Sequence, residues 1–156
     1  PARRPSSHQG TFTWDTPPTW KEKPASGMRL ANFTAGPEDE VECYIIQMNA
    51  DGGGLAANVN RWREQMGQEP LSDDALAALP QLDMLGRKGT LVEITGEYTA
   101  MSGQPSPGSM MLGVVCLLDD SSIFVKMTGP EAAVRAESDH FKAFCTSLRL
   151  AGEAQS

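Results

Sequence analysis

Residues Asp51–Met66, DGGGLAANVNRWREQM, have the most unusual local composition of this 156-residue chain, because a glycine run leads directly into an amphipathic helix. After the glycines, apolar side chains recur at steps of four, three and four residues, at Leu55, Val59, Trp62 and Met66. A helix that packs one face on a sheet shows such a stripe. Gly67 and Pro70 follow where helices usually end. The stretch therefore predicts a helix packed on a β-sheet.

The segments before this helix predict three strands. Phe12 and Trp14 alternate, but a Pro-Pro pair follows, so we expect a short edge strand. Residues 28–34 and 41–48 are rich in β-favouring side chains and flank an acidic turn, which predicts an antiparallel hairpin. Trp14 and Trp20 are more typical of tryptophans that close one end of a core. An exposed aromatic platform for a peptide or sugar is the alternative.

The segments after the helix predict a short helix, three strands and a closing helix. Ser72 is a good helix cap, and the short helix that follows it ends before Pro80. A helix also begins near Pro130, with an apolar stripe at Val134, Phe141, Phe144, Cys145 and Leu148. The three strands between these helices are expected at residues 90–98, 110–118 and 122–127.

This order of elements predicts an α+β fold, with a single twisted, mainly antiparallel sheet flanked by helices. We expect one globular domain over residues 11–150, a flexible N-terminal arm at 1–10 and a C-terminal tail at 151–156. The strand at 110–118 is apolar on both faces, so it belongs inside the sheet.

Composition and charge exclude several classes of protein. The net charge of −7 argues against a nucleic-acid binder, which needs a basic face. No apolar run approaches the roughly 20 residues of a transmembrane segment. Because the chain begins at Pro1 without an initiator methionine, we expect that a preceding segment, such as an export signal or a lipid anchor, has been removed.

The sequence contains no complete catalytic or metal-binding signature. A nucleophile needs a base, and only His8 and His140 are available, with no G-x-S-x-G motif. No C-x-x-C or H-x-x-x-H spacing is present, so we expect no metal and no cofactor. The eight methionines are more typical of core filling than of a copper site. Three cysteines in apolar stretches favour buried free thiols over a single disulfide: Cys43, Cys116 and Cys145.

The glycine run Gly52, Gly53 and Gly54 has more than one interpretation. Glycines before a helix expose N–H groups at the positive end of the helix dipole, so they can hold an anion or a carboxylate. The run matches neither G-x-G-x-x-G nor G-x-x-x-x-G-K-S/T, and Asp51 beside it would repel an anion. We favour a tight strand-to-helix turn that needs positive φ, with anion capture or a protein contact as alternatives.

The polar side of the helix carries the other candidate binding residues, Asn58, Asn60, Arg61 and Arg63. Asn58, Arg61 and Gln65 lie off the apolar stripe, so we expect them to face solvent or a partner. Asparagine is unusual inside a helix, because its side chain competes for backbone hydrogen bonds.

Two structural roles would explain these asparagines. Asn58 would cap the helix if residues 54–57 formed an entry turn. In the other role, which we favour, the asparagine and arginine side chains bond to the loops around Trp14 or Pro105 and hold them in place.

Several parts of the sequence together resemble a group of uncharacterised bacterial envelope proteins. The likeness covers most of Thr11–Leu150, and NVNRWR and KMTGP are its most specific motifs; it also rests on the opening W…PPTW, on MRLANF, on the glycine run and on the closing Phe141…Phe144…Leu148. Many members look like lipoproteins or exported proteins. The resemblance therefore implies an exported, non-enzymatic protein of the periplasm or outer envelope, although the lipid-anchor cysteine is not in this chain.

More distantly, the tryptophan-proline start, the strand order and the closing helix resemble the PsbP fold. That fold is an α/β/α sandwich shared by a photosystem extrinsic protein and a nuclear Ran-binding protein. This second resemblance implies the arrangement of helices and sheet, and it transfers no function.

These observations lead us to expect a non-catalytic envelope or periplasmic accessory domain that binds a protein or a small ligand. The contact would involve the polar face of the NVNRWR helix and the loop Met101–Ser109. The alternative is an anion-binding protein or an enzyme that uses the Gly52–Gly54 turn. A third hypothesis makes the domain a rigid spacer in a larger assembly.

Overall fold

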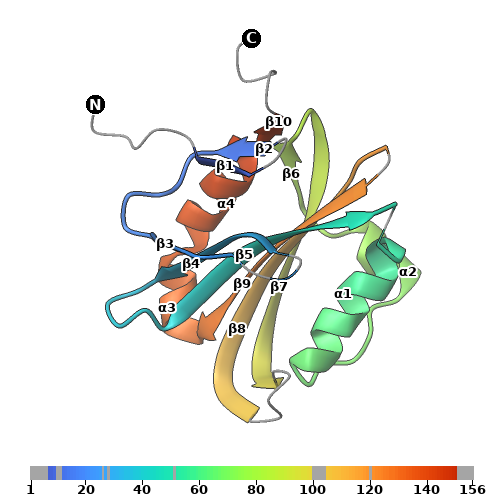
Figure 1. The fold of residues 1–156 in the computed structure, drawn as a ribbon. Helices are drawn as coiled ribbons and strands as arrows, with labels where there is room; N and C mark the ends of the chain where they lie inside the picture. Colours follow the sequence, from blue (N-terminus) through green and yellow to red (C-terminus); the bar gives the residue numbers. More distant parts are fainter. Residues whose placement is uncertain are drawn as a thin grey trace.

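A computed structural model (Figure 1) describes residues 7–9, 12–25, 27, 29–50, 52–99, 105–119 and 121–150. Its elements in chain order are β1 (Ser7–Gln9), β2 (Phe12–Trp14), β3 (Lys21–Lys23), β4 (Arg29–Ala35), β5 (Val41–Asn49), α1 (Gly54–Gln65), α2 (Asp73–Ala77), β6 (Gln81–Met84), β7 (Arg87–Thr99), β8 (Pro105–Leu117), β9 (Ser121–Pro130), α3 (Glu131–Ala136), α4 (Ser138–Ser147) and β10 (Arg149–Leu150). None of the described helices has the length and apolar character needed to cross a membrane.

The main sheet has seven strands in the order β3-β4-β5-β9-β8-β7-β6, and every neighbouring pair is antiparallel. The chain lays down β3, β4 and β5 in sequence, and then α1 and α2 carry it to the far edge. From β6 it returns strand by strand until β9 pairs with β5 in the middle. The predicted hairpin of the second and third strands is confirmed as β4 and β5.

Helices cover both faces of this sheet, which confirms the predicted α+β fold (Figure 1). Side chains alternate along the central strands, so Val41, Cys43 and Ile45 of β5 pack into the core shared with α3 and α4. Ile46 and Met48 face the other way, toward the core under α1 and α2. Strand β8 lies inside the sheet and is buried on both faces, as its apolar run predicts.

Helix α1 lies close to the sheet because a glycine stands beneath its tryptophan. Val59, Trp62 and Met66 are buried against the sheet, as the apolar stripe predicts. Gly113 of β8 lies under the ring, and a Cβ atom placed there would come within 2.4 Å of Trp62 Cζ3. Since real Cβ atoms do not approach so closely, only glycine leaves room for the indole at this position.

The predicted edge strand at Phe12–Trp14 is wrong in one respect. Strand β2 is the middle strand of a separate three-stranded sheet, between β1 and β10. The Pro-Pro pair does not interfere, because it follows the end of the strand. Its second neighbour, β10, comes from the other end of the chain, and a local pattern cannot reveal such a partner.

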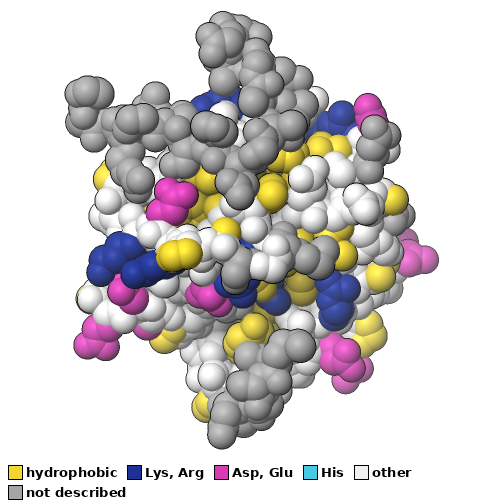
Figure 2. All heavy atoms as spheres, in the orientation of Figure 1, with side chains coloured by type: hydrophobic (Ala, Val, Ile, Leu, Met, Phe, Trp, Pro, Cys, Tyr) yellow, Lys and Arg dark blue, Asp and Glu magenta, His cyan; other side chains and the backbone are white. Residues whose placement is uncertain are grey.

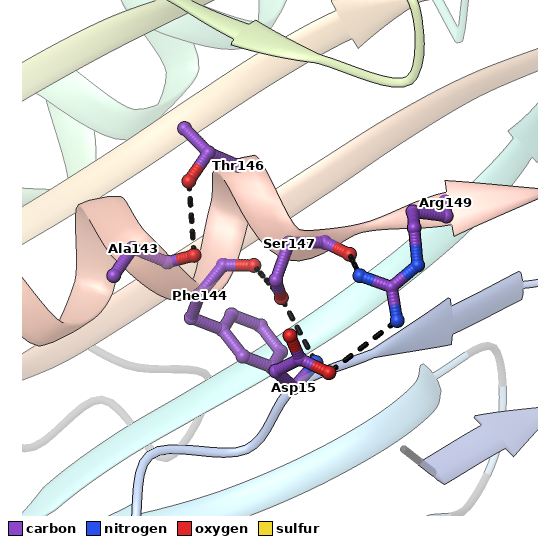
Figure 3. Close-up of polar contacts among 6 residues, drawn as sticks. All are labelled: Asp15, Ala143, Phe144, Thr146, Ser147 and Arg149. Carbon is purple, nitrogen blue, oxygen red and sulfur yellow. Dashed lines mark hydrogen bonds and ion pairs between the residues drawn. The ribbon is translucent and has the colours of Figure 1, made fainter. Parts of the chain in front are cut away.

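Polar contacts attach the end of α4 to the end of β2 (Figure 3). The backbone N–H of Asp15 donates a hydrogen bond to Ser147 Oγ at 2.9 Å, and Arg149 Nη2 lies 3.3 Å from Asp15 Oδ1. Ser147 Oγ itself donates to the carbonyl of Phe144 at 2.6 Å. The small sheet is thereby held against the helix that closes the chain.

Trp14 and Trp20 are both buried, so they close one end of the core and do not form an exposed platform. Their rings pack with Phe33 and Phe144, with ring centroids 5.1–6.4 Å apart. Trp20 Nε1 also donates to Glu137 Oε1 at 2.8 Å. Glu137 separates α3 from α4, so the single closing helix that the sequence predicts is interrupted at this residue.

Several predicted boundaries need correction. Residues 81–84, where the sequence predicts no strand, form β6, which is only four residues long, and the exposed Lys21–Lys23 forms β3 without any apolar signal. Strand β8 begins at Pro105, so the second half of the loop Met101–Ser109 is strand, and residues 101–104 lie outside the described residues. Of the predicted arm at 1–10, the backbone of 7–9 forms β1; the remainder and the tail at 151–156 lie outside the described residues.

The three cysteines are free and buried, as expected. Burial raises the pKa of Cys43 and Cys145 well above the ordinary value for a thiol, and it raises that of Cys116 to about 11. A thiol that stays protonated is a poor nucleophile. Within the described ranges, no group of three or more His, Cys, Asp or Glu residues is placed to hold a metal ion.

Candidate functional site

The glycine run forms the tight strand-to-helix turn that we favoured. Gly52, Gly53 and Gly54 have φ values of 61°, 100° and 91°, in the left-handed region that side chains disfavour. The turn also lies close to the sheet, because a Cβ at Gly52 would come within 2.7 Å of Ser122 Oγ. The amide of Asn58 donates to the carbonyls of Gly52 and Gly54, at 3.0 and 2.7 Å. The turn is thus attached to its own helix.

Asn58 does not face solvent or a partner, and that expectation is wrong. The side chain is fully buried and folds back on the first turn of α1. Its amide oxygen accepts a hydrogen bond from Arg61 Nη2. The residue at the N-cap position is Gly53, so Asn58 supports the start of the helix from inside and is not the cap itself.

Asn60 and Arg63 bond to the segment that follows α1. Asn60 Oδ1 accepts from the N–H of Leu71 at 2.8 Å, and Arg63 Nε donates to the carbonyl of Glu69. The favoured network of polar side chains therefore exists, but these bonds reach the next loop along the chain and not the Trp14 or Pro105 loops. Both residues fold residues 67–71 back along the helix.

Arg61 stands between two concavities. On the outer side of α1, it lines an open hollow of about 620 Å³, which we call the outer hollow. On the inner side, it lines a smaller cleft of about 170 Å³ between α1 and the sheet, the inner cleft. The outer hollow is lined by Ala57, Asn60, Arg61, Glu64, Gly67, Gln68, Glu69 and Pro70. The inner cleft is lined by Tyr44, Ile46, Met48, Arg61, Trp62, Gln65, Phe124 and Lys126.

Lys126 is the functional candidate that our reading of the sequence missed. It lies on β9, next to Tyr44 of β5 on one side and Gly113 of β8 on the other, and only 6% of its surface is exposed. Its Nζ donates to Gln65 Oε1 at 2.7 Å and lies 5.9 Å from the ring centroid of Trp62. In the described part of the chain, no carboxylate forms an ion pair with this ammonium.

The electrostatic surroundings of Lys126 are positive. The pKa of Lys126 is lowered to about 8, mainly by burial and also by the charges of Arg61 and Arg29, while Glu42 acts in the opposite direction. Arg29 and Glu42 form an ion pair of 3.0 Å, so they largely neutralise each other. That pairing leaves Lys126 and Arg61 as two positive charges with no paired acid among the described residues.

Two tyrosines near the cleft remain neutral donors. Burial raises the pKa of Tyr44 to about 12 and also raises the pKa of Tyr98. Lys126 Nζ lies 5.7 Å from the ring centroid of Tyr98, and Arg29 stacks on the Tyr44 ring at 3.8 Å. The inner cleft therefore combines two cations with aromatic walls, and Tyr44, one of its lining residues, stays uncharged.

One signal in the sequence would have revealed Lys126. In the run Ser122–Met127, it is a charged residue at a central-strand position where its neighbours are apolar. A buried lysine without an acidic partner is rare and is typical of functional sites. Its helical neighbours Arg61 and Gln65 lie far away in the sequence, so their contribution needed the folded structure.

The fold places this chain in the PsbP-like class of α+β domains. Among solved structures, it is similar to cyanobacterial PsbP (CyanoP) from Synechocystis sp. PCC 6803, with a TM-score of 0.57 and 14% identity over 96% of this chain and 94% of that one. It is also similar to LpqN of Mycobacterium tuberculosis, a protein involved in cell envelope biogenesis, with a TM-score of 0.54 and 14% identity over 94% and 90% of the two chains.

At 14% identity, these likenesses show the fold alone. No protein-family model matches the sequence, and no curated protein matches it either. The distant PsbP-like fold is thus confirmed, whereas membership of a bacterial family with the NVNRWR motif stays a prediction.

Proposed function

We propose that this chain is an exported, non-catalytic accessory domain of the bacterial cell envelope that binds a protein or a small ligand at α1. The periplasmic or outer-envelope location rests on the resemblance to exported proteins and on the fold that the chain shares with LpqN, which is involved in cell envelope biogenesis. The binding role rests on the surface around Arg61. This surface consists of the outer hollow and the inner cleft.

Lys126 is the observation that carries the binding role. A buried ammonium whose hydrogen-bond acceptor is a neutral amide lowers the stability of the fold, because burial disfavours its charge. Such a group inside a concavity, with Arg61 beside it, is what a site for an anionic group requires. A domain that serves only as a rigid spacer gains nothing from this arrangement.

The other candidate residues take different parts in the proposal. Asn58, Asn60 and Arg63 shape α1 and the loop after it, and Arg61 makes the contact. The turn at Gly52–Gly54 positions the helix, and the proposal uses no anion bound to it. Ser106 and Ser109 line a neighbouring hollow of about 380 Å³ together with Tyr98, so the start of β8 extends the contact surface beyond the cleft.

The charges on the face drawn in Figure 2 do not suggest a nucleic-acid partner. In the view of Figure 2, Lys and Arg side chains are interspersed with Asp and Glu, and the side chains drawn in colour form no extended basic surface. We therefore look for the partner among envelope proteins and small molecules.

Site-specific photo-crosslinking tests this function. A photoreactive amino acid at Ala57, which lines the outer hollow, should crosslink to a component of the envelope fraction of the source bacterium. The matched control places the same group at Arg135, an exposed residue of α3, which belongs to the layer on the opposite face of the sheet. Equal crosslinking at both positions, or crosslinking only to cytosolic components, would refute the proposal.

A further inference from the structure

We propose that the inner cleft binds the carboxylate group of an organic acid, with Lys126 and Arg61 holding the carboxylate and the aromatic walls surrounding its apolar body. The inference rests on the proposed function, since it names the chemistry of the ligand for the same site. It assigns a contact role to Lys126, Arg61 and Gln65.

The positive charges of Lys126 and Arg61 favour an anionic ligand. Lys126 and Arg61 approach the cleft from β9 and α1, and Glu42, the acid that acts on Lys126, is paired with Arg29. Glu64 and Glu69 lie with Arg61 in the outer hollow and do not line the cleft. Lys126 has three N–H donors, and the described acceptor, Gln65 Oε1, uses one of them. Among the described residues, Arg61 donates one hydrogen bond, to Asn58, and it has four further donors. A carboxylate would supply acceptors for both side chains and offset their positive charge.

The volume and the lining of the cleft favour an organic acid over inorganic phosphate as the ligand. A volume of about 170 Å³ suits a group the size of a benzene ring, since a cavity of about 150 Å³ accepts benzene in another protein. Trp62, Phe124, Ile46 and Met48 are four of its eight lining residues, and the ring of Tyr44 is a fifth. Inorganic phosphate has no apolar part to place against such walls, whereas an aromatic or branched carboxylate does.

The same carboxylate chemistry has two possible sources, a free organic acid or the C-terminus of a partner polypeptide. Both can present a planar carboxylate next to an apolar side chain. The cleft opens beside the outer hollow, because Arg61 lines both, so a peptide backbone leaving the cleft would find room there. The probes therefore include one molecule of each kind.

The experiment uses the purified chain and follows backbone, Trp62 indole and Gln65 side-chain amide signals by NMR. The probes are benzoate, its neutral counterpart benzamide, inorganic phosphate, the peptide acetyl-Gly-Gly-Phe with a free C-terminus, and the same peptide as a C-terminal amide. We expect benzoate or the free peptide to shift the Trp62 and Gln65 signals in a saturable way, while benzamide and the peptide amide leave them unchanged. Stronger binding of benzoate indicates a free acid as the source, and stronger binding of the peptide indicates a polypeptide terminus.

Two variants and one control connect the shifts to the cleft. Lys126→Met and Arg61→Gln each remove one charge, and each should weaken carboxylate binding by about tenfold or more, as expected for a charge-assisted contact. Arg135→Gln, on the opposite layer, should bind like the wild type. Arg61 is exposed and its replacement leaves the core intact, so this variant keeps the test valid even if Lys126→Met alters the fold.

The pH dependence provides a further readout. The groups around Lys126 are Arg61 of α1, Arg29 of β4, Glu42 and Tyr44 of β5, and Tyr98 of β7. The carboxylate prefers the protonated lysine, so binding should be tightest below pH 8 and should weaken above it, while bound ligand raises the pKa of Lys126.

Three outcomes would overturn the inference. Equal binding of benzamide and benzoate would show an apolar site with no role for charge. Saturable binding of phosphate, with no binding of either carboxylate probe, would show that the cleft binds a different kind of anion. Failure of every probe to shift the Trp62 signal would refute the inner cleft as a carboxylate site, and a crosslink at Ala57 would then still support the proposed function through the outer hollow.

Discussion

Lys126 occupies a position on β9 whose neighbours Val125 and Met127 are fully buried in the opposite core. Its ammonium is shielded from water by Trp62 and Tyr98, and burial disfavours its charged form. The folded protein thus binds a proton at this lysine less readily than the unfolded chain does. Stability and ligand binding therefore place opposite demands on the residue.

Replacing this lysine should stabilise the protein at neutral pH. The pKa of Lys126 falls from 10.5 to about 8 on folding, so its protonation opposes folding fully below pH 8, and the cost disappears as pH rises toward 10.5. We expect Lys126→Met to raise the free energy of unfolding by about 1–3 kcal/mol at pH 7, since each pKa unit corresponds to about 1.4 kcal/mol and some favourable contacts are lost.

Urea denaturation of both proteins at pH 7 and pH 10 measures this effect. The advantage of the variant should shrink between the two pH values. An equal difference at both pH values would show that the charge of Lys126 plays no part, and a less stable variant at pH 7 would mean that the contacts with Gln65 and Trp62 outweigh its burial.

Asn58 supports the start of α1 from inside the protein. Removing its amide in Asn58→Ala would leave the carbonyl of Gly52 without this donor and Arg61 without an acceptor. We expect a loss of about 1–3 kcal/mol in the free energy of unfolding, because a buried polar partner is removed. Thermal and urea unfolding check the prediction, with Asn60→Ala as the comparison. Because Asn60 is more exposed, Asn60→Ala should lower the free energy of unfolding less than Asn58→Ala does. A larger loss for Asn60→Ala would contradict the role of Asn58.

At the scale of elements, α1 depends on the small residue beneath it. Gly113 lies opposite Val92 and Lys126 in the sheet, directly under the Trp62 ring. Its backbone is ordinary strand, so glycine is needed there for space and not for an unusual φ. The contact joins the crossover helix to the middle of the sheet.

Gly113→Ala should push α1 away from the sheet. We expect it to lower the free energy of unfolding by about 1–3 kcal/mol, because the new Cβ has no room under the indole. A double-mutant cycle with Trp62→Ala isolates the cause: once the ring is gone, the alanine should cost little. If the alanine costs the same in both backgrounds, the clash with Trp62 is not the reason.

Elements with a long periodic pattern could be predicted from the sequence, whereas short polar ones could not. The stripe Leu55–Met66 predicts α1 correctly, since burial on one face requires apolar residues at helical spacing. Strand β3 is KEK and exposed, so backbone pairing with β4, and not burial of apolar side chains, gives it its conformation. The break at Glu137 likewise depends on a distant partner, the indole N–H of Trp20.

The candidate site was predicted in part for the same reason. Arg61 carries a charge on an exposed helix face and is visible in the motif NVNRWR. Asn58 looked equally exposed, but it is buried because its side chain turns toward the glycine carbonyls. Lys126 comes from a strand far along the chain, and its pairing with Gln65 exists only after β9 has joined β5.

For the whole molecule, the location in the cell remains the property to test. We expect the protein, expressed from its complete gene in the source bacterium, to be found with the periplasmic or membrane-associated fraction. This expectation follows from the proposed function, which takes the chain to be exported. Cell fractionation followed by immunodetection measures this distribution, with a cytosolic enzyme as the fractionation marker. Recovery with that marker would contradict export.

The class of fold follows from the sequence alone, because apolar periodicity indicates which face of each long element is buried. The glycine turn before α1 also follows from the sequence, since only glycine adopts three consecutive positive φ values at low cost. The residues that surround this helix, in contrast, depend on how the distant strands assemble. After α2 the chain runs to the edge of the sheet and comes back through β6, β7, β8 and β9, which places Lys126 beneath α1. Burial at this position lowers the pKa of the lysine. Long-range strand pairing creates this environment, and no local pattern contains it.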